Sequence, residues 1–177
     1  MTQASTIAGG RANPALAIVS ADQDTIIGNG TTEDPLRLGT GGQTTAVAVF
    51  GSGAVPKCTP MRPVALAERV VSSALASSNR SVATVMGLLV TGVAALQVDR
   101  ADTIQYEGVF EATTAEWDAV TGGSGGLIPG EPYYVSDTTG RITGTAPNTS
   151  GHFITQIGIS LSTTELLLQI SAPQAIP

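Results

Sequence analysis

The stretch "GGLIPGEPYYVSDTTGRITG", from Gly125 to Gly144, decides the predicted fold of this chain. Pro129-Gly130 is typical of a type II turn, and the "DTTG" of residues 137–140 is typical of a hairpin turn. Between these turns, the aromatic and apolar residues of "PYYVS" predict a strand over residues 132–136. The stretch therefore predicts turn, strand, turn and strand, and it contains no residue pattern that is typical of catalysis.

The residues on both sides of this stretch extend the pattern of short strands. Thr113 and Glu116 have the spacing of a capping box, which predicts a short helical turn that holds Trp117 and ends at the glycines of residues 122–126. In "TIQYEGVFEA", residues 103–112, apolar and polar residues nearly alternate, as they do in a half-buried strand. We expect further strands over residues 64–71, 82–90, 94–99, 152–161 and 165–171.

These elements predict an all-β fold, a small sandwich or barrel of short antiparallel strands with one short helical turn. We place this β-rich domain over residues 61–177, which carry six of the seven aromatic residues. Residues 1–60 are rich in Gly, Thr and Pro, and their apolar runs, such as "TII" and "LRL", are short. We interpret them as an extended arm with room for a small hairpin. An arm that buries so little by itself is suited to adding strands or extended segments to a neighbouring chain.

The chain is acidic but contains few charged residues. Its 177 residues carry a net charge of −6, and charged residues make up 12% of the total. Residues 101–137 hold seven acidic residues and no basic one. Because such a face repels phosphate backbones, we expect no nucleic-acid partner. A solvated surface is the interpretation we favour, and contact with a basic partner or a cation is the alternative.

No segment of the sequence is predicted to enter a membrane. The N-terminal residues lack the basic region and the long apolar run of a signal peptide. The most apolar window, residues 83–98, is shorter than the roughly 20 residues that span a bilayer, and we interpret it as buried strand. We therefore expect synthesis in a cytoplasm and no membrane partner.

Cys58 and His152 are the only candidates for a cysteine nucleophile and its base. Cys58 lies in the proline-rich "VPKCTPMRP", with no helix N-terminus to lower its pKa, and His152 opens a predicted strand after a loop. A single cysteine excludes an internal disulfide, and with a single histidine it also excludes the common zinc sites. We predict no catalytic residues and no metal site, and we expect the chain not to be an enzyme.

The glycine-rich and acidic segments predict no cofactor. "GNGTTE" lacks the third glycine of a dinucleotide-binding fingerprint, and "GGSGG" is not followed by the Lys of a phosphate-binding loop. An acidic cluster contains Ile26 at a position where an EF-hand requires an oxygen ligand. A solvated turn is the interpretation we favour for this cluster, and a different calcium site is the alternative. The cluster consists of Asp22, Asp24, Asn29, Glu33 and Asp34.

Trp117 raises the alternative of a site for sugars. It lies beside Glu116 and Asp118, although a hydrolase cleft normally uses more aromatic residues than this chain supplies. Together with Tyr133 and Tyr134, Trp117 is also a candidate for an exposed platform that binds a receptor or a glycan. Packing in the core or in an interface is the interpretation we favour for Trp117.

The C-terminal third of the chain resembles a domain found at the C-termini of tailed-bacteriophage virion proteins. The similarity covers residues 113–170, with a weaker extension back to about residue 61. It rests on the Trp-containing turn, the Gly-Gly run, "GLIPGEPYY", "TAPNTSG" and "GISLSTTELL". The upstream "TIIGNGTTEDPLRL" is similar to a hairpin segment of phage fibre-type proteins, over a shorter length.

This resemblance implies a structural role in a virion and supplies no catalytic residues. The chain shows no repetitive or coiled-coil shaft of the kind that fibres use, which favours a capsid decoration (cement) protein. The implied partners are the major capsid protein or other virion proteins, with the arm lying across neighbouring subunits. Similar virion proteins often occupy threefold sites, so a homotrimer is expected. The alternative is a short tail-fibre or adhesin component that binds a host receptor or glycan.

Overall fold

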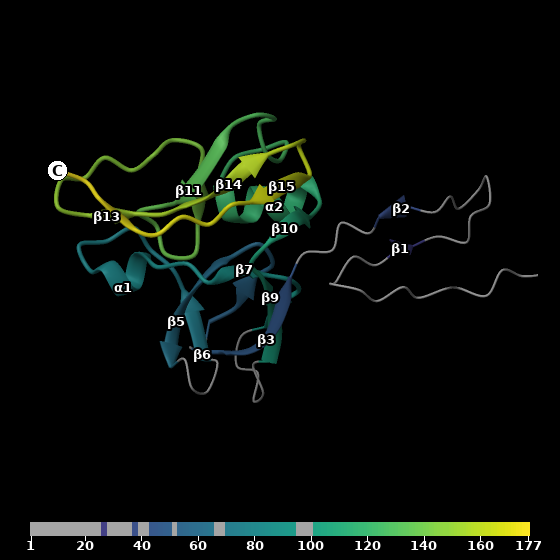
Figure 1. Cartoon of the computed structure of the whole chain (residues 1–177), viewed down its shortest axis with the longest axis horizontal. Helices are drawn as coiled ribbons and strands as arrows, with labels where there is room; N and C mark the ends of the chain where they lie inside the picture. The colour runs from purple at the N-terminus through teal and green to yellow at the C-terminus, as the bar shows by residue number, and fades with distance from the viewer. Residues whose placement is uncertain (1–25, 28–36, 39–42, 51–52, 66–69, 95–100) are drawn as a thin grey trace, which may run out of the picture. The chain divides into compact units, whose positions relative to one another are not determined.

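The computed structural model describes residues 26–27, 37–38, 43–50, 53–65, 70–94 and 101–177, which fall into two units (Figure 1). The first unit, Met1–Gly41, contains β1 (Ile26–Ile27) and β2 (Arg37–Leu38), which pair antiparallel. These strands match the "TII" and "LRL" runs of the expected hairpin. The second unit, Gly42–Pro177, contains every other strand and both helices in the described part of the chain.

A closed five-stranded barrel forms the first half of the second unit. Its strands follow one another around the barrel in the order β3-β6-β5-β7-β9, and β3 pairs with β6 in parallel while the other pairs are antiparallel. The strands are β3 (Thr44–Val49), β5 (Pro60–Ala65), β6 (Val70–Ser73), β7 (Gly87–Leu89) and β9 (Ala101–Gln105).

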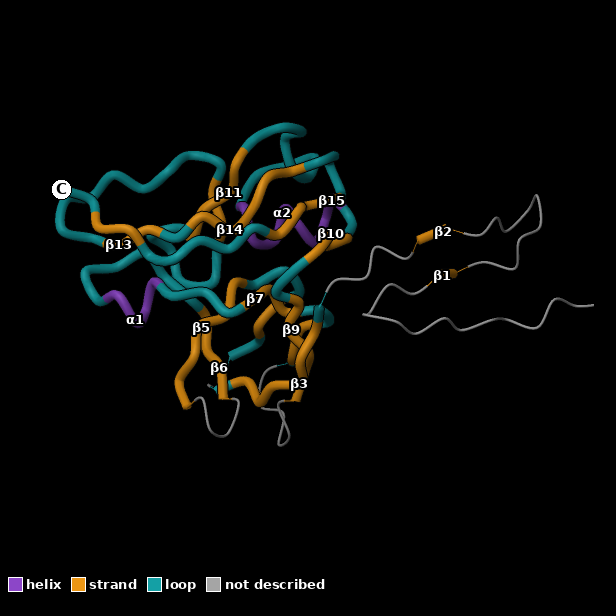
Figure 2. Tube along the Cα trace, in the orientation of Figure 1, coloured by secondary structure: helices purple, strands orange, loops and turns teal. Residues whose placement is uncertain are grey.

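A five-stranded antiparallel sheet forms the second half, in the order β10-β15-β14-β11-β12. Figure 2 shows this sheet above the barrel, with helix α2 (Thr114–Thr121) beside β10 and β15. The strands are β10 (Gly108–Glu111), β11 (Pro132–Val135), β12 (Ile142–Thr143), β14 (Gln156–Ser160) and β15 (Glu165–Leu168).

Three smaller elements complete the second unit. Helix α1 (Arg80–Ala83) lies between β6 and β7 and is capped by the side chain of Asn79. The other two are short antiparallel strand pairs. One joins β4 (Val55–Pro56) to β8 (Gly92–Val93). The other joins β13 (Phe153–Ile154) to β16 (Gln174–Ala175).

Strand β7 joins the barrel to the C-terminal sheet because it is buried on both faces. Leu89 belongs to the cluster that fills the barrel, whereas Leu88 belongs to the larger cluster under the C-terminal sheet, and both are 0% exposed. Cys58 also packs in the larger cluster. Contiguous apolar burial of this kind is the main favourable term in folding, so the two halves fold against each other.

The structure confirms the expected all-β class and most of the detail of residues 113–144. Helix α2 carries the capping box of Thr113 and Glu116 and ends at Gly122, which has a φ of 72°. Around Pro129-Gly130, the amide of Glu131 donates to the carbonyl of Ile128 at 3.2 Å, and Gly130 has a φ of 83°, as in a type II turn. Strands β11 and β12 form the expected hairpin.

Several predicted strands are wrong in their extent. Residues 64–71 are not one strand, because β5 and β6 pair antiparallel across that region. Residues 82–90 contain the end of α1 followed by β7, and residues 103–112 divide into β9 of the barrel and β10 of the sheet. Residues 152–161 divide into β13 and β14. The strand expected over 94–99 lies almost entirely outside the described residues.

The boundary between arm and domain also differs from the expected position near residue 60. Strand β3 pairs with β9 along five residues and also pairs with β6, so it is one of the strands of the barrel. Val47 and Val49 of β3 are buried in the barrel core. The "TAVAVF" run therefore belongs to the β-rich unit, which begins at Gly42.

Candidate interaction surfaces

Trp117 lies in the core, which excludes it from an exposed platform. Its side chain is 0% exposed, its indole Nε1 donates to the carbonyl of Thr164 at 3.0 Å, and its ring meets Phe110 edge-on with 5.6 Å between centroids. Tyr133 is 4% exposed and Tyr134 is half-buried. The platform of Trp117, Tyr133 and Tyr134 is therefore wrong, and core packing is the correct interpretation of Trp117.

Cys58 is a buried thiol in an environment that opposes reactivity. It is 0% exposed, and burial raises the pKa of its thiol to about 12, with Lys57 acting in the opposite direction. A thiol with such a pKa is almost entirely protonated at neutral pH and is a poor nucleophile. His152 instead lies beside Asp137, with 3.6 Å between Nδ1 and Oδ1. The charged groups that act on the thiol are Lys57 and Glu116, so the described contacts do not pair Cys58 with His152.

The "GGSGG" loop holds an internal carboxylate where a phosphate-binding loop would hold its ligand. Asp118 accepts hydrogen bonds from the amides of Gly125, at 3.1 Å, and Gly126, at 2.8 Å. Both glycines have positive φ values, which turn their amides toward this side chain. Because these amides are already satisfied by the Asp118 carboxylate, the loop has a structural role, which is to fix the turn that follows α2.

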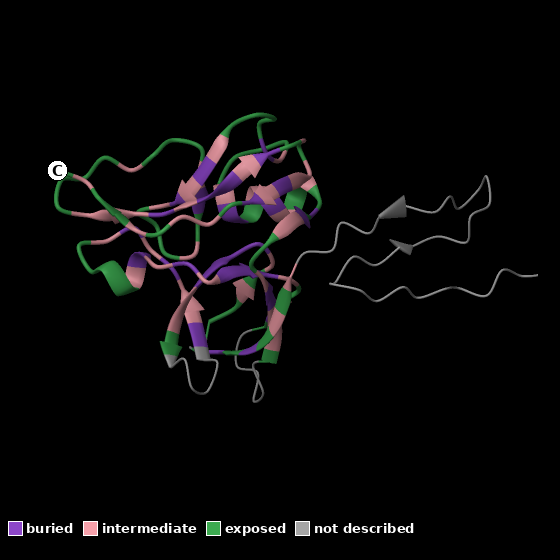
Figure 3. Cartoon of the chain, in the orientation of Figure 1, coloured by how far each residue is buried: buried purple, intermediate pink, exposed green. Residues whose placement is uncertain are grey.

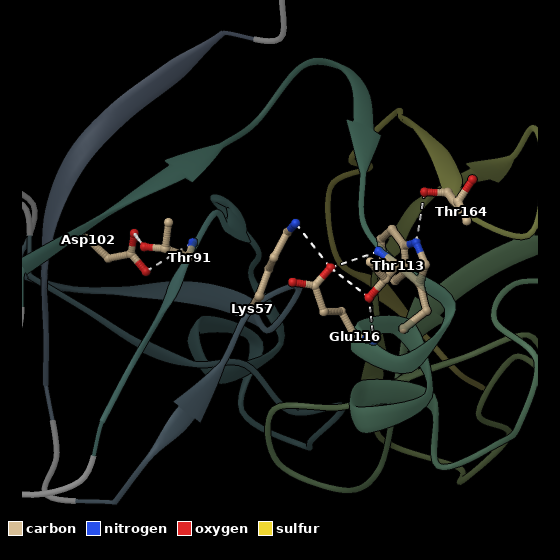
Figure 4. A network of polar contacts seen from close by, with 7 residues as sticks. Lys57, Thr91, Asp102, Thr113, Glu116 and Thr164 are labelled. Atoms are coloured by element: carbon tan, nitrogen blue, oxygen red, sulfur yellow. Dashed lines mark hydrogen bonds and ion pairs between the residues drawn. The ribbon is translucent and has the colours of Figure 1, made fainter.

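Lys57, the only lysine of the chain, links the turn after β4 to the start of α2. Its Nζ lies 3.2 Å from Oε2 of Glu116, which also accepts from the amide of Thr113 at 2.7 Å (Figure 4). The hydrogen bond from the Thr113 backbone is the main cause that lowers the pKa of Glu116, and Lys57 adds to it. A cavity of about 350 Å³ opens beside this pair, lined also by Glu111, Ala112, Thr164 and Glu165.

The acidic residues between 101 and 137 are only partly a solvated surface. Asp102 accepts a hydrogen bond from the Thr91 hydroxyl at 2.6 Å (Figure 4). It also accepts one from the Gly92 amide at 2.6 Å, so it fixes the turn before β8. Glu116 caps the N-terminus of α2, and Asp118 binds the amides of the loop that follows the helix. The capping box predicted the role of Glu116, whereas the structural roles of Asp102 and Asp118 were not indicated by the sequence.

Large apolar side chains are exposed at two ends of the second unit, and sequence analysis missed all of them. Phe50 and Val64, which we name the barrel-end pair, are 65% and 45% exposed, and both lie at the end of the barrel where the amide of Phe50 donates to Val71. Ile128 and Leu161, the tip pair, are 63% and 50% exposed. The hydroxyl of Ser160 donates to the carbonyl of Ile128, which links the two chain segments that carry the tip pair.

The two pairs lie at different ends of the unit. In Figure 3, strands β5 and β6 of the barrel end near the bottom of the view, whereas β14 and β15 lie in its upper part. Apolar residues that stand singly on a surface are ordinary, but a pair from two separate segments marks a candidate contact site. The sequence analysis placed these residues in the arm and therefore did not indicate that Phe50 is exposed at the end of a barrel strand.

Two further features were sought among the described residues: a cluster of metal ligands and a helix that could span a membrane. No three His, Cys, Asp or Glu side chains among the described residues come together in a way that could hold a metal ion. The five-residue acidic cluster that starts at Asp22 lies outside the described residues. In the part of the chain that the structure describes, no helix has the length and apolarity needed to cross a bilayer.

No protein-family model matches the chain, and no curated protein matches it at a significant level.

Proposed function

We propose that this chain is a non-enzymatic virion structural protein that decorates and stabilises a bacteriophage capsid through its N-terminal arm and its β-rich unit. The observation that carries the proposal is the presence of two exposed apolar pairs at different ends of one rigidly packed unit. A cement protein bridges neighbouring subunits, so it requires at least two contact sites on a stable body.

The resemblance of residues 113–170 to phage virion domains supports the class of protein. Its motifs occupy positions that build the fold: Trp117 fills the core, the glycine run ends α2, and the Pro129-Gly130 turn precedes β11. The motifs therefore belong to the folded core of the second unit. We propose that the exposed pairs and the arm make the contacts with other virion proteins. The proposed partners are the major capsid protein and two further copies of this chain in a homotrimer.

Substitution of the exposed pairs tests this proposal directly. We expect the double variant Phe50→Ser with Val64→Ser, or Ile128→Ser with Leu161→Ser, to lower the occupancy of the protein on particles by about tenfold or more, because each removes apolar contact area. Tyr106→Ser is the matched control, since Tyr106 is a large side chain, 38% exposed, that belongs to neither pair.

Circular dichroism of each variant checks whether the second unit is folded. Co-sedimentation with particles that lack the protein measures the binding of each variant. Wild-type occupancy for both double variants would contradict the proposal. Loss of occupancy in Tyr106→Ser to the same extent would also contradict it, because binding would then not depend on the two pairs.

A further inference from the structure

A second cavity, of about 440 Å³, lies between the loop that follows α2 and strand β12. This volume is within the range of roughly 300–1,000 Å³ that small-molecule sites occupy. Hydroxyl side chains and glycines form most of its wall, together with one carboxylate, one aromatic ring and one apolar side chain. The lining residues are Thr121, Gly123, Ser124, Gly126, Ile128, Glu131, Tyr133, Thr143, Gly144 and Thr145.

Tyr133 contributes to the lining of this groove a hydroxyl group with an unused hydrogen. Tyr133 is 4% exposed, and its hydroxyl oxygen accepts the amide hydrogen of Ile128 at 3.0 Å. No acceptor for the hydroxyl's own hydrogen is found among the residues that the structure describes. Gly144 lies close to the ring, because a Cβ at that position would lie 3.9 Å from two of its carbons. A buried donor without an acceptor is costly unless a ligand or water completes it.

The wall of the groove supplies complementary groups around this donor. Glu131 is exposed, and its carboxylate has no hydrogen-bond or ion-pair partner among the described residues. The hydroxyls of Thr121 and Ser124 add groups that both donate and accept. Ile128, 63% exposed, supplies an apolar surface at the rim. The lining contains no cation, so its formal charge of −1 disfavours phosphates and other anions.

We propose that this groove binds one or two units of a neutral saccharide. Sugar hydroxyls can donate to Glu131 and accept from Tyr133, while the C–H face of the ring packs on Ile128. An extended peptide is disfavoured, because the bordering strand β12 has only two residues and Ile142 is 1% exposed, which leaves little free edge to extend. The site shares Ile128 with the tip pair of the proposed capsid contact, and of the excluded platform it uses only Tyr133.

Titration of the full-length protein with methyl glycosides of glucose, galactose, mannose and N-acetylglucosamine tests the site, with amide chemical shifts as the readout. At least one glycoside is expected to bind with a Kd near about 1 mM and to shift the amides of Gly123, Gly126, Gly144 and Thr145. Glu131→Gln is expected to weaken binding by about tenfold. Glu107→Gln removes an exposed carboxylate outside the groove and should retain wild-type affinity.

A steric variant separates loss of the site from loss of folding. Gly144→Val places a side chain over the Tyr133 ring at a position with no positive φ, so the unit should fold and lose glycoside binding. Gly53→Val, where a Cβ meets nothing within 4 Å, is the matched control and should bind normally. The proposal is overturned if none of the four glycosides shifts these amides, if Glu131→Gln and Gly144→Val bind as the wild type does, or if only short peptides or anions bind.

Discussion

At the scale of single residues, Trp117 holds three parts of the C-terminal half together. Its side chain projects from α2, its ring packs against Phe110 of β10, and its indole N–H is bonded to Thr164 in the turn between β14 and β15. Since β10 and β15 are paired, this one side chain ties the helix to both strands. The same contacts explain why the residue is unavailable for a ligand.

Trp117→Ala is expected to lower the free energy of unfolding by about 3–5 kcal/mol, the range for removing a buried aromatic side chain. Urea denaturation followed by circular dichroism measures this change, because the variant lacks the indole fluorophore. Tyr106→Ala, at a 38% exposed position, should cost less than about 1 kcal/mol. An equal loss in the free energy of unfolding for the two variants would contradict the central position of Trp117.

At the scale of elements, the start of α2 gives the unit a pH-dependent contribution to stability. Hydrogen bonds from Thr113, together with Lys57, favour the ionised form of Glu116 and lower its pKa in the folded state. The contribution is therefore present above the pKa that Glu116 has in the unfolded chain, and it is lost as the pH falls through the lower pKa of the folded state.

Glu116→Gln should consequently be less stable than the wild type at neutral pH, and the difference should shrink as the pH falls through the lowered pKa of Glu116. Urea unfolding at a series of pH values measures the difference, with Glu107→Gln as the charge-matched control. A stability difference that stays constant over the whole pH range would show that the charge of the Glu116 carboxylate does not contribute to the stability of the helix cap.

The glycine loop after α2 provides a second test at this scale. Gly125 and Gly126 both have φ values in the left-handed region, at 88° and 84°, so alanine at either position is expected to cost about 1–2 kcal/mol. A Cβ at Gly125 meets open space, whereas a Cβ at Gly126 would collide with the carbonyl oxygen of Thr163. Gly126→Ala should therefore have a clearly lower Tm than Gly125→Ala, and equal Tm values would contradict the close approach.

Local patterns in the sequence predicted the elements that are defined by short-range chemistry. The capping box at Thr113, the glycine at the end of α2 and the Pro129-Gly130 turn are each set by neighbours within a few residues. Residues 103–112 show the limit of this reasoning: their alternation is nearly continuous, yet the chain leaves the barrel and enters the other sheet within them. Gly108, with a φ of 85°, follows that break, which periodicity did not reveal.

The candidate contact surfaces could not be predicted for a related reason. Alternation in "TAVAVF" shows that two faces exist, but barrel closure decides that Val47 and Val49 face inward while Phe50 is exposed. The segments that carry Ile128 and Leu161 are linked by a hydrogen bond from Ser160, which is 32 residues from Ile128 in the chain. Contacts between distant segments of this kind carry no signature in a single sequence.

At the scale of the whole molecule, the division of the chain into Met1–Gly41 and Gly42–Pro177 separates a stable body from the proposed arm. The barrel core and the larger core both lie within the second unit, so its folding does not require the first. The proposed function uses the arm for attachment to neighbouring virion subunits.

Deletion of residues 1–41 should leave the body folded, with a Tm within a few degrees of the full-length protein, and should abolish its binding to particles. Calorimetry measures the first property, and co-sedimentation with particles measures the second. Replacement of residues 1–41 by a Gly/Ser segment of the same length controls for chain length. Normal particle binding by the truncated protein would contradict the role of the arm.

The central claim is that this chain decorates a capsid, and its position on intact particles tests that claim most directly. Electron microscopy of particles labelled through an affinity tag at the C-terminus, beside the exposed residues of β16, locates each copy. The account predicts label distributed over the head surface, in groups of three at equivalent lattice positions. Label confined to tail fibres or to the tail tip, or no label on particles at all, would contradict it.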